Sequence, residues 1–145
     1  MEGKPSGLDI FYLKNKGLMG IISASCRAHS TRELEHHVGL VRCGLYDGAE
    51  GWRQEDRALH GVESAISGGK AVCSFSDLAP GKYALAVFHA EHGETKIDYG
   101  FLGKPKQGVG FSNNPSLRFG PPSFEAASFR VGQEARHLEL TSSPA

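Results

Sequence analysis

The sequence predicts an all-β protein, an antiparallel β-sandwich of about seven short strands. Apolar and polar residues alternate over several short segments, which is the pattern of half-buried strands. Glycine, at 19 of 145 residues, has nearly twice its usual share, which suits a domain with many turns. No segment sustains the 3.6-residue period of an amphipathic helix. The length fits one domain, which we place at residues 18–141, with tails at 1–17 and 142–145.

The alternating segments give the order of the expected strands. They cover residues 22–29, 38–46, 62–66, 71–76, 82–89, 129–131 and 138–140. Residues 82–89 are apolar almost throughout, which indicates a central strand covered on both faces. Residues 49–59 have helical composition and predict a short helical turn anchored by Trp52 and Leu59. Residues 77–81 predict a type II turn in which Gly81 takes a positive φ.

A single hydrophobic core follows from the strand faces. The residues expected in it are Val41, Leu45, Phe75, Leu85, Val87, Phe129 and Leu138. The 16 basic residues balance the 16 acidic ones, so no global field draws the protein toward nucleic acid or an anionic membrane. No apolar run approaches the roughly 20 residues that a bilayer span requires.

The three cysteines allow more than one interpretation. Cys26, Cys43 and Cys73 lie within expected strands, where a free cysteine behaves as a small buried hydrophobe, and we favour buried thiols. One disulfide with a spare thiol is the alternative in an oxidising compartment. The spacings match no zinc pattern.

The N-terminal region also has two interpretations. Lys14 and Lys16 precede a short apolar stretch that ends before Cys26, an order similar to a secretory or lipoprotein signal. The stretch is short and diluted by serine, and from Ile22 onward it alternates with period two. We therefore favour a strand over a signal.

Residues 100–129 form the most distinctive segment, GFLGKPKQGVGFSNNPSLRFGPPSFEAASF. It lacks clear periodicity and is rich in Gly, Pro, Asn and Ser, yet it carries regularly placed phenylalanines, which a disordered linker does not need. We predict one long ordered surface loop. Ser112, Asn113 and Asn114 are expected to bond backbone groups in tight turns, while Phe111 and Phe124 hold the loop on the sandwich.

Three segments carry a family resemblance. They are GLVRCGLYDGAEGW, FSDLAPGKYALAVFHAEHG and FLGKPKQGVGFSNN followed by FGPPSFEAASF. They resemble the bacterial family called domain of unknown function 2141, whose pattern includes G-x-V-x-x-x-L-[YF] and a GFSN-N block followed by PSF. The resemblance covers roughly residues 20–140. It implies an immunoglobulin-like or transthyretin-like sandwich, usually exported to the periplasm or secreted, with no established activity.

The chain departs from the family pattern after His89. Members often carry a D-x-N-x-N-G-x-x-D run that resembles a calcium loop. Here the stretch reads AEHGETKID, so Glu91, Glu94 and Asp98 keep oxygen ligands but their regular alternation is lost. We expect a solvated acidic loop, and we predict no metal and no cofactor.

The expected site lies around the long loop. Its candidate ligand-binding residues are His89, His92, Asp98, Phe111, Ser112, Asn113, Asn114 and Phe124. The first hypothesis is a non-catalytic module that binds a carbohydrate, a peptide or a partner protein at residues 100–125. The second is a structural domain whose long loop closes a sheet edge. The third is a hydrolase that uses His89, Asp98 or Ser112, although the sequence around Ser112 is no nucleophile elbow.

Overall fold

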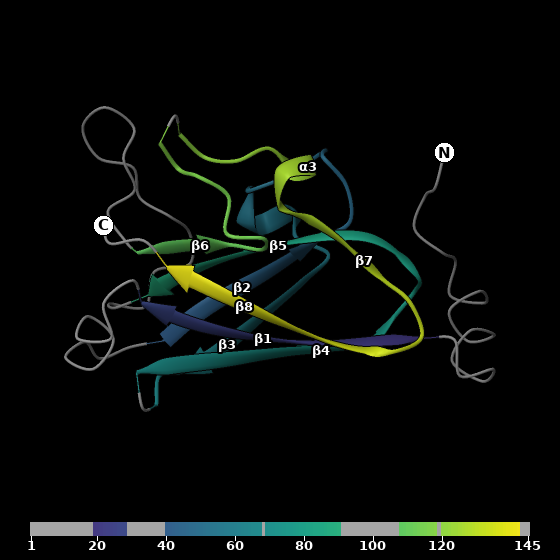
Figure 1. Ribbon diagram of the computed structural model, residues 1–145, viewed down its shortest axis with the longest axis horizontal. Helices are drawn as coiled ribbons and strands as arrows, with labels where there is room; N and C mark the ends of the chain where they lie inside the picture. Colours follow the sequence, from purple (N-terminus) through teal and green to yellow (C-terminus); the bar gives the residue numbers. More distant parts are fainter. Residues whose placement is uncertain (1–18, 29–39, 68, 91–107, 119, 143–145) are drawn as a thin grey trace.

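The computed structural model describes residues 19–28, 40–67, 69–90, 108–118 and 120–142. These residues form two β-sheets packed face to face (Figure 1). The smaller sheet has the order β4-β1-β8, with β1 Gly20–Ala28, β4 Lys70–Leu78 and β8 Ala135–Ser142. The five-stranded sheet has the order β3-β2-β5-β6, with β7 also paired to β5. Its strands are β2 Leu40–Tyr46, β3 His60–Ala65, β5 Gly81–Ala90, β6 Val109–Phe111 and β7 Ser128–Val131.

Two short helical segments lie on the same side of the molecule. The 3-10 helix η1 covers Glu55–Arg57, inside the segment where a helical turn was predicted. The helix α3 covers Phe124–Ala127 and lies beside the segment that follows β2 (Figure 1). Ser123 caps α3, because its side chain accepts a hydrogen bond from the backbone N–H of Ala126. Neither described helix has the length and apolar character needed to cross a membrane.

The predicted β-sandwich is confirmed, with eight strands in the described part of the chain. One strand pair differs from the antiparallel prediction. β1 and β8 run parallel, with Ile21 opposite Ala135 and Ala28 opposite Ser142. A parallel pair needs a long connection, and nearly the whole domain lies between these two strands. β8 ends at Ser142, which is the first residue of the predicted C-terminal tail.

The core between the two sheets confirms the predicted set. All seven residues expected there are buried in one cluster: Val41, Leu45, Phe75, Leu85, Val87, Phe129 and Leu138. The predicted alternation is also present in β1, where Ile22, Ala24 and Cys26 face this core. Burying each large apolar side chain stabilises the fold by roughly 1.5–3 kcal/mol.

A second apolar cluster covers the outer face of the five-stranded sheet. On β5, Leu85 and Val87 face the inter-sheet core, while Ala84 and Phe88 belong to the outer cluster. This arrangement confirms the prediction that residues 82–89 form a strand covered on both faces. The outer cover comes from α3, β6 and the segment between β2 and β3.

The predicted type II turn at residues 77–81 is wrong in its backbone. Asp77 takes the positive φ, at 58°, and Gly81 is the first residue of β5. The cause is a bulge in β4, because Gly20 lies opposite Leu78 while Ile22 lies opposite Phe75. β4 thus carries one extra residue there, and aspartate tolerates the left-handed conformation that such a bulge requires.

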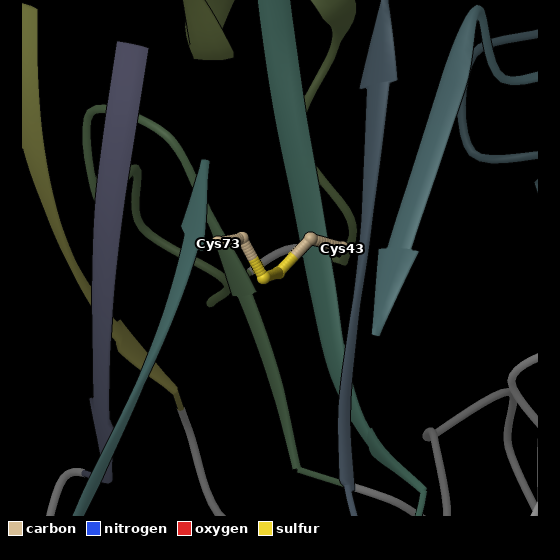
Figure 2. Close-up of a disulfide and its surroundings, with 2 residues drawn as sticks. All are labelled: Cys43 and Cys73. Carbon is tan, nitrogen blue, oxygen red and sulfur yellow. A yellow bond between two sulfur atoms is a disulfide. The ribbon is translucent and has the colours of Figure 1, made fainter. Parts of the chain in front are cut away.

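A disulfide joins Cys43 to Cys73, with a Cα–Cα distance of 6.6 Å (Figure 2). The favoured prediction of three free thiols is therefore wrong for this pair, and it holds for Cys26, which is free and buried. Cys43 on β2 and Cys73 on β4 both face the inter-sheet core, so the bond spans the two sheets. The alternation of apolar and polar residues predicted that both side chains point inward. It did not predict that β2 and β4 face one another across the core.

The long segment is more regular than predicted. Residues 100–107 lie outside the described residues, as does Phe119, but the rest holds β6, α3 and the start of β7. β6 has only three residues, all buried, so it shows no alternation that would distinguish it from a loop. The prediction of a single loop over this length was wrong for that reason.

Truncation of Leu85 tests the inter-sheet core. Leu85 is fully buried, so Leu85→Ala should lower the free energy of unfolding by about 2–5 kcal/mol, measured by denaturant titration. Val72→Ala is the matched control, since Val72 is 42% exposed and its truncation should change stability by less than about 0.5 kcal/mol. Equal losses in the two variants would contradict the assigned core.

Cysteine chemistry tests the disulfide. Cys43→Ala together with Cys73→Ala should cost about 3–4 kcal/mol, because the bond closes a loop with a sequence separation of 30. Burial raises the pKa of the Cys26 thiol to about 12, so the reactive thiolate is scarce near neutral pH. Mass spectrometry after iodoacetamide should therefore show no adduct on the native protein. One adduct should appear after unfolding without reductant, whereas three at that step would exclude the disulfide.

Candidate functional site

β5 changes its hydrogen-bonding partner at Leu85. Along the edge of β5 that faces away from β2, residues 81–84 pair with β7 and residues 86–88 pair with β6. No strand pairs with Leu85 on this edge. Ser112 takes this place. Its backbone N–H donates to Leu85 O at 3.0 Å, and Leu85 N–H donates to Ser112 Oγ at 2.9 Å. The Ser112 hydroxyl also donates to Ala127 O, so the fully buried side chain joins β5 to the end of α3.

Asn113 and Asn114 continue the same turn with φ values of 68° and 46°. Asn113 Nδ2 donates to Ala126 O at 3.2 Å and to Ser128 O at 2.6 Å. Asn114 Nδ2 donates to Glu139 O at 3.0 Å, and Thr141 N–H donates to Asn114 Oδ1 at 2.8 Å. The Asn114 amide thus bonds β8 much as a neighbouring strand would. The predicted bonding of these turn residues to backbone groups is confirmed.

Four aromatic rings pack over the outer face beside this turn: Tyr46, Trp52, Phe111 and Phe124. The Trp52 ring lies 5.1 Å from Tyr46, 5.9 Å from Phe111 and 5.8 Å from Phe124, measured between ring centroids. Trp52 Nε1 donates to Pro122 O at 2.9 Å, so the polar end of the indole is also used. Phe111 and Phe124 are both buried here, as expected of side chains that hold the segment on the sandwich.

A cavity of about 80 Å³ opens next to these rings on the outer face of the five-stranded sheet. We call it the outer-face cavity. Its lining combines small residues, aromatic rings and charged side chains, including Gly44, Gly61, Ala86, Tyr46, Phe88, Phe111, Arg42, Arg53 and Glu55. Gly44 and Gly61 are opposite one another on β2 and β3, and the absence of side chains at both positions leaves this space.

The charged side chains that line the cavity are Arg42 on β2 and Arg53 and Glu55 in the segment between β2 and β3. Arg42 Nη2 lies 3.2 Å from Glu63 Oε1 on β3. Arg42 Nε is buried and has no hydrogen-bond acceptor among the described residues. Arg53 has φ 68°, a left-handed conformation that is costly for a residue with a long side chain. Such an outlier is a reason to look for a function at this segment.

The structure places only some of the predicted site residues near one another. Phe111 lines the cavity and Phe124 belongs to the same apolar cluster as Phe111, whereas Ser112, Asn113 and Asn114 follow Phe111 in the chain and do not line the cavity. His89 is buried on β5, where its backbone N–H donates to Gly108 O at 3.0 Å. His92 and Asp98 lie outside the described residues, as do the weak metal candidates Glu91 and Glu94. No group of three metal-ligating side chains occurs in the described ranges.

Sequence reasoning missed the residues that define the cavity. Arg42 occupies an outward position in an otherwise apolar strand, and Gly44 follows two residues later on the same face. An isolated glycine inside a strand often marks a close approach or an open space, so the pair Gly44 and Gly61 was the available indication. The register that brings these two glycines together was not predictable from either strand alone.

A polar chain on the other sheet was also missed. Ser23 Oγ lies 3.0 Å from His137 Nδ1, and His137 Nε2 lies 3.4 Å from Glu139 Oε1. This order resembles a nucleophile, base and acid. However, Ser23 lies on the central strand of its sheet, where the neighbouring backbone N–H groups serve β4 and β8. Donors for an oxyanion are therefore lacking at Ser23, and His137 is half exposed on an open face. We interpret these residues as a surface network.

Substitutions in the turn test its hydrogen bonds. Ser112→Ala leaves the buried Leu85 N–H and Ala127 C=O without their partner, so the free energy of unfolding should fall by about 1–3 kcal/mol. Asn113→Ala should cost a similar amount, because it removes two bonds to the end of α3. Ser74→Ala, an exposed position on β4, is the control. Unchanged urea midpoints in the turn variants would contradict this role.

Comparisons with known proteins agree with the resemblance seen in the sequence. No curated protein matches this chain. Among solved structures, the chain is similar to a pilus-presented adhesin, Cpa, at 8% identity and a TM-score of 0.25. The alignment covers 87% of this chain and 27% of the adhesin chain, and a similarity this low supports no argument about fold or function. The model of a family described as an uncharacterized protein conserved in bacteria matches residues 31–139. The chain therefore belongs to the domain of unknown function 2141 family.

Proposed function

We propose that this protein is a non-catalytic binding domain and that its ligand occupies the outer-face cavity. The observation that carries the proposal is the lining of that cavity, in which aromatic rings and charged groups converge around a space left by two glycines. Binding sites are typically concave and apolar, with a few polar groups that orient the ligand. Phe111 belongs to both this cavity and the 100–125 segment in which we expected the site.

The conformation of Arg53 supports a binding role. A left-handed backbone at a non-glycine residue costs about 1–2 kcal/mol. Arg53 takes this conformation where its side chain reaches the cavity. Glycine would remove the strain at the loss of the guanidinium group. Arg53 thus brings a guanidinium group to the cavity at a backbone cost that glycine would avoid.

Catalysis by Ser112 has no support in the geometry. Its hydroxyl donates to Ala127 O and accepts from Leu85 N–H, and its side chain is fully buried. A nucleophile needs an exposed oxygen next to a general base. We therefore favour binding over the hydrolase alternative.

The disulfide supports a location outside the cytoplasm, in the periplasm or beyond the cell. Structural disulfides form and persist in oxidising compartments and are rare in reducing ones. Cys43 and Cys73 are buried between two sheets, where a bond is protected from exchange. Members of the family that the sequence resembles are usually exported, which agrees with this proposal.

A purely structural domain is the second candidate. It is favoured by the use of the Ser112, Asn113 and Asn114 side chains, all of which bond backbone groups. The Ser112 hydroxyl and the Nδ2 groups of both asparagines are thus used within the domain. The two candidates differ in one respect, because only the first requires the outer-face cavity to be occupied.

Filling the cavity distinguishes the two candidates. A Cβ at Gly61 would lie 4.0 Å from its nearest neighbour, Cys43 O, and valine suits a strand, so Gly61→Val should fold. A fragment library screened by amide NMR should shift resonances around Gly44, Gly61 and Ala86 in the natural protein and should not shift them in this variant. Gly132→Val is the control, because no atom lies within 4 Å of a Cβ built at Gly132. Fragment binding that survives Gly61→Val would exclude the outer-face cavity as the site.

A further inference from the structure

We infer that the outer-face cavity recognises an uncharged, hydroxyl-bearing ligand, a sugar residue, through Arg42 and the surrounding aromatic rings. This inference rests on the proposed function and adds the chemical class of its ligand. Three properties of the cavity carry it: a balance of charge, a buried donor without an acceptor, and rings beside a space of limited size.

The charges at the cavity cancel one another. The charged residues of the lining are Arg42, Arg53 and Glu55, and Arg42 is paired at 3.2 Å with Glu63, which is not part of the lining. Two cations and two anions leave no excess positive charge to attract a carboxylate or phosphate. An anionic ligand would add a negative charge that these groups do not balance. A hydroxyl group carries no charge and both donates and accepts hydrogen bonds, so it suits a site that offers donors and acceptors together.

Arg42 supplies the donor that lacks a partner. Its Nη2 is used by Glu63, whereas its Nε is buried and has no acceptor among the described residues. A buried N–H without an acceptor is costly, and the cost is larger for a charged group. A ligand oxygen in the cavity would accept this bond. Arg42 lines the cavity, and its side chain as a whole is 29% exposed.

The aromatic residues suit the apolar edge of a sugar ring. Tyr46, Phe88 and Phe111 all line the cavity. Each of them is at most 5% exposed, so only a small part of each ring borders the cavity, and the C–H groups along one edge of a pyranose pack against this apolar border. The volume of about 80 Å³ is far below the several hundred Å³ of a site that encloses a whole drug-sized ligand. The cavity therefore admits one edge of a sugar ring, with the rest of the ligand outside.

Titrations followed by amide NMR test the ligand class. The neutral probes are methyl glycosides of hexoses and of N-acetylhexosamines, and the anionic probes are acetate and methyl glucuronide. We expect a neutral glycoside to shift resonances of Gly44, Gly61 and Ala86. Arg42→Met keeps most of the side-chain bulk and removes the Nε donor, so it should weaken this binding at least about tenfold. Gly132→Ala, at a position that does not line the cavity and has room for a Cβ, should leave the affinity unchanged.

The other outcomes separate this inference from the proposed function. Binding of the anionic probes alone at the cavity would overturn the sugar inference and leave the cavity as a binding site. Sugar binding that Arg42→Met does not weaken would also overturn it. Glu63→Gln adds a further check, because it leaves one positive charge in excess. It should strengthen binding of the anionic probes and leave glycoside binding within about twofold. An absence of shifts with every probe and with the fragment library would instead reject the proposed function itself.

Discussion

The arrangement around this cavity depends on the point where β5 exchanges one partner strand for another. β7 and β6 are both short, and each covers only part of the same edge of β5. At the break, the Leu85 N–H and C=O are buried and need partners, since an unpaired buried backbone group costs free energy comparable to a lost hydrogen bond. Ser112 satisfies both groups from one residue. The turn must then bury a serine at this position, and two asparagines with left-handed φ values follow it.

This constraint also explains where the aromatic residues lie. Because β6 ends at the break, Phe111 is fixed immediately before Ser112 and lies on the outer face of the sheet. The segment after the turn returns through α3, which brings Phe124 to the same cluster. Trp52 then packs against both rings and bonds Pro122 O. On the other side of the sheet, the disulfide links β2 to β4 across the core. β5 is thus enclosed on both faces.

The sequence was sufficient for features that depend on a local period. Alternation predicted the inward residues of β1, and the apolar run of β5 predicted a strand buried on both faces. The sequence was insufficient where the structure depends on the register between strands that are distant in the chain. The approach of Cys43 to Cys73, the three-residue strand β6 and the opposition of Gly44 to Gly61 are all of this kind. The prediction of the turn at residues 77–81 was wrong for a related reason, because a bulge is defined only by pairing with the partner strand.

The outer-face cavity lies beside the predicted site and shares only Phe111 with it. The GFSNN block is the most specific part of the family resemblance, yet its polar side chains bond the backbone of this same domain. Arg42 and Gly44 occupy positions that the G-x-V-x-x-x-L-[YF] pattern leaves open, and Gly61 lies outside the segments that carry the resemblance. The GFSNN block therefore accounts for the scaffold at the break in β5, and Phe111 is the one residue of this block that lines the cavity.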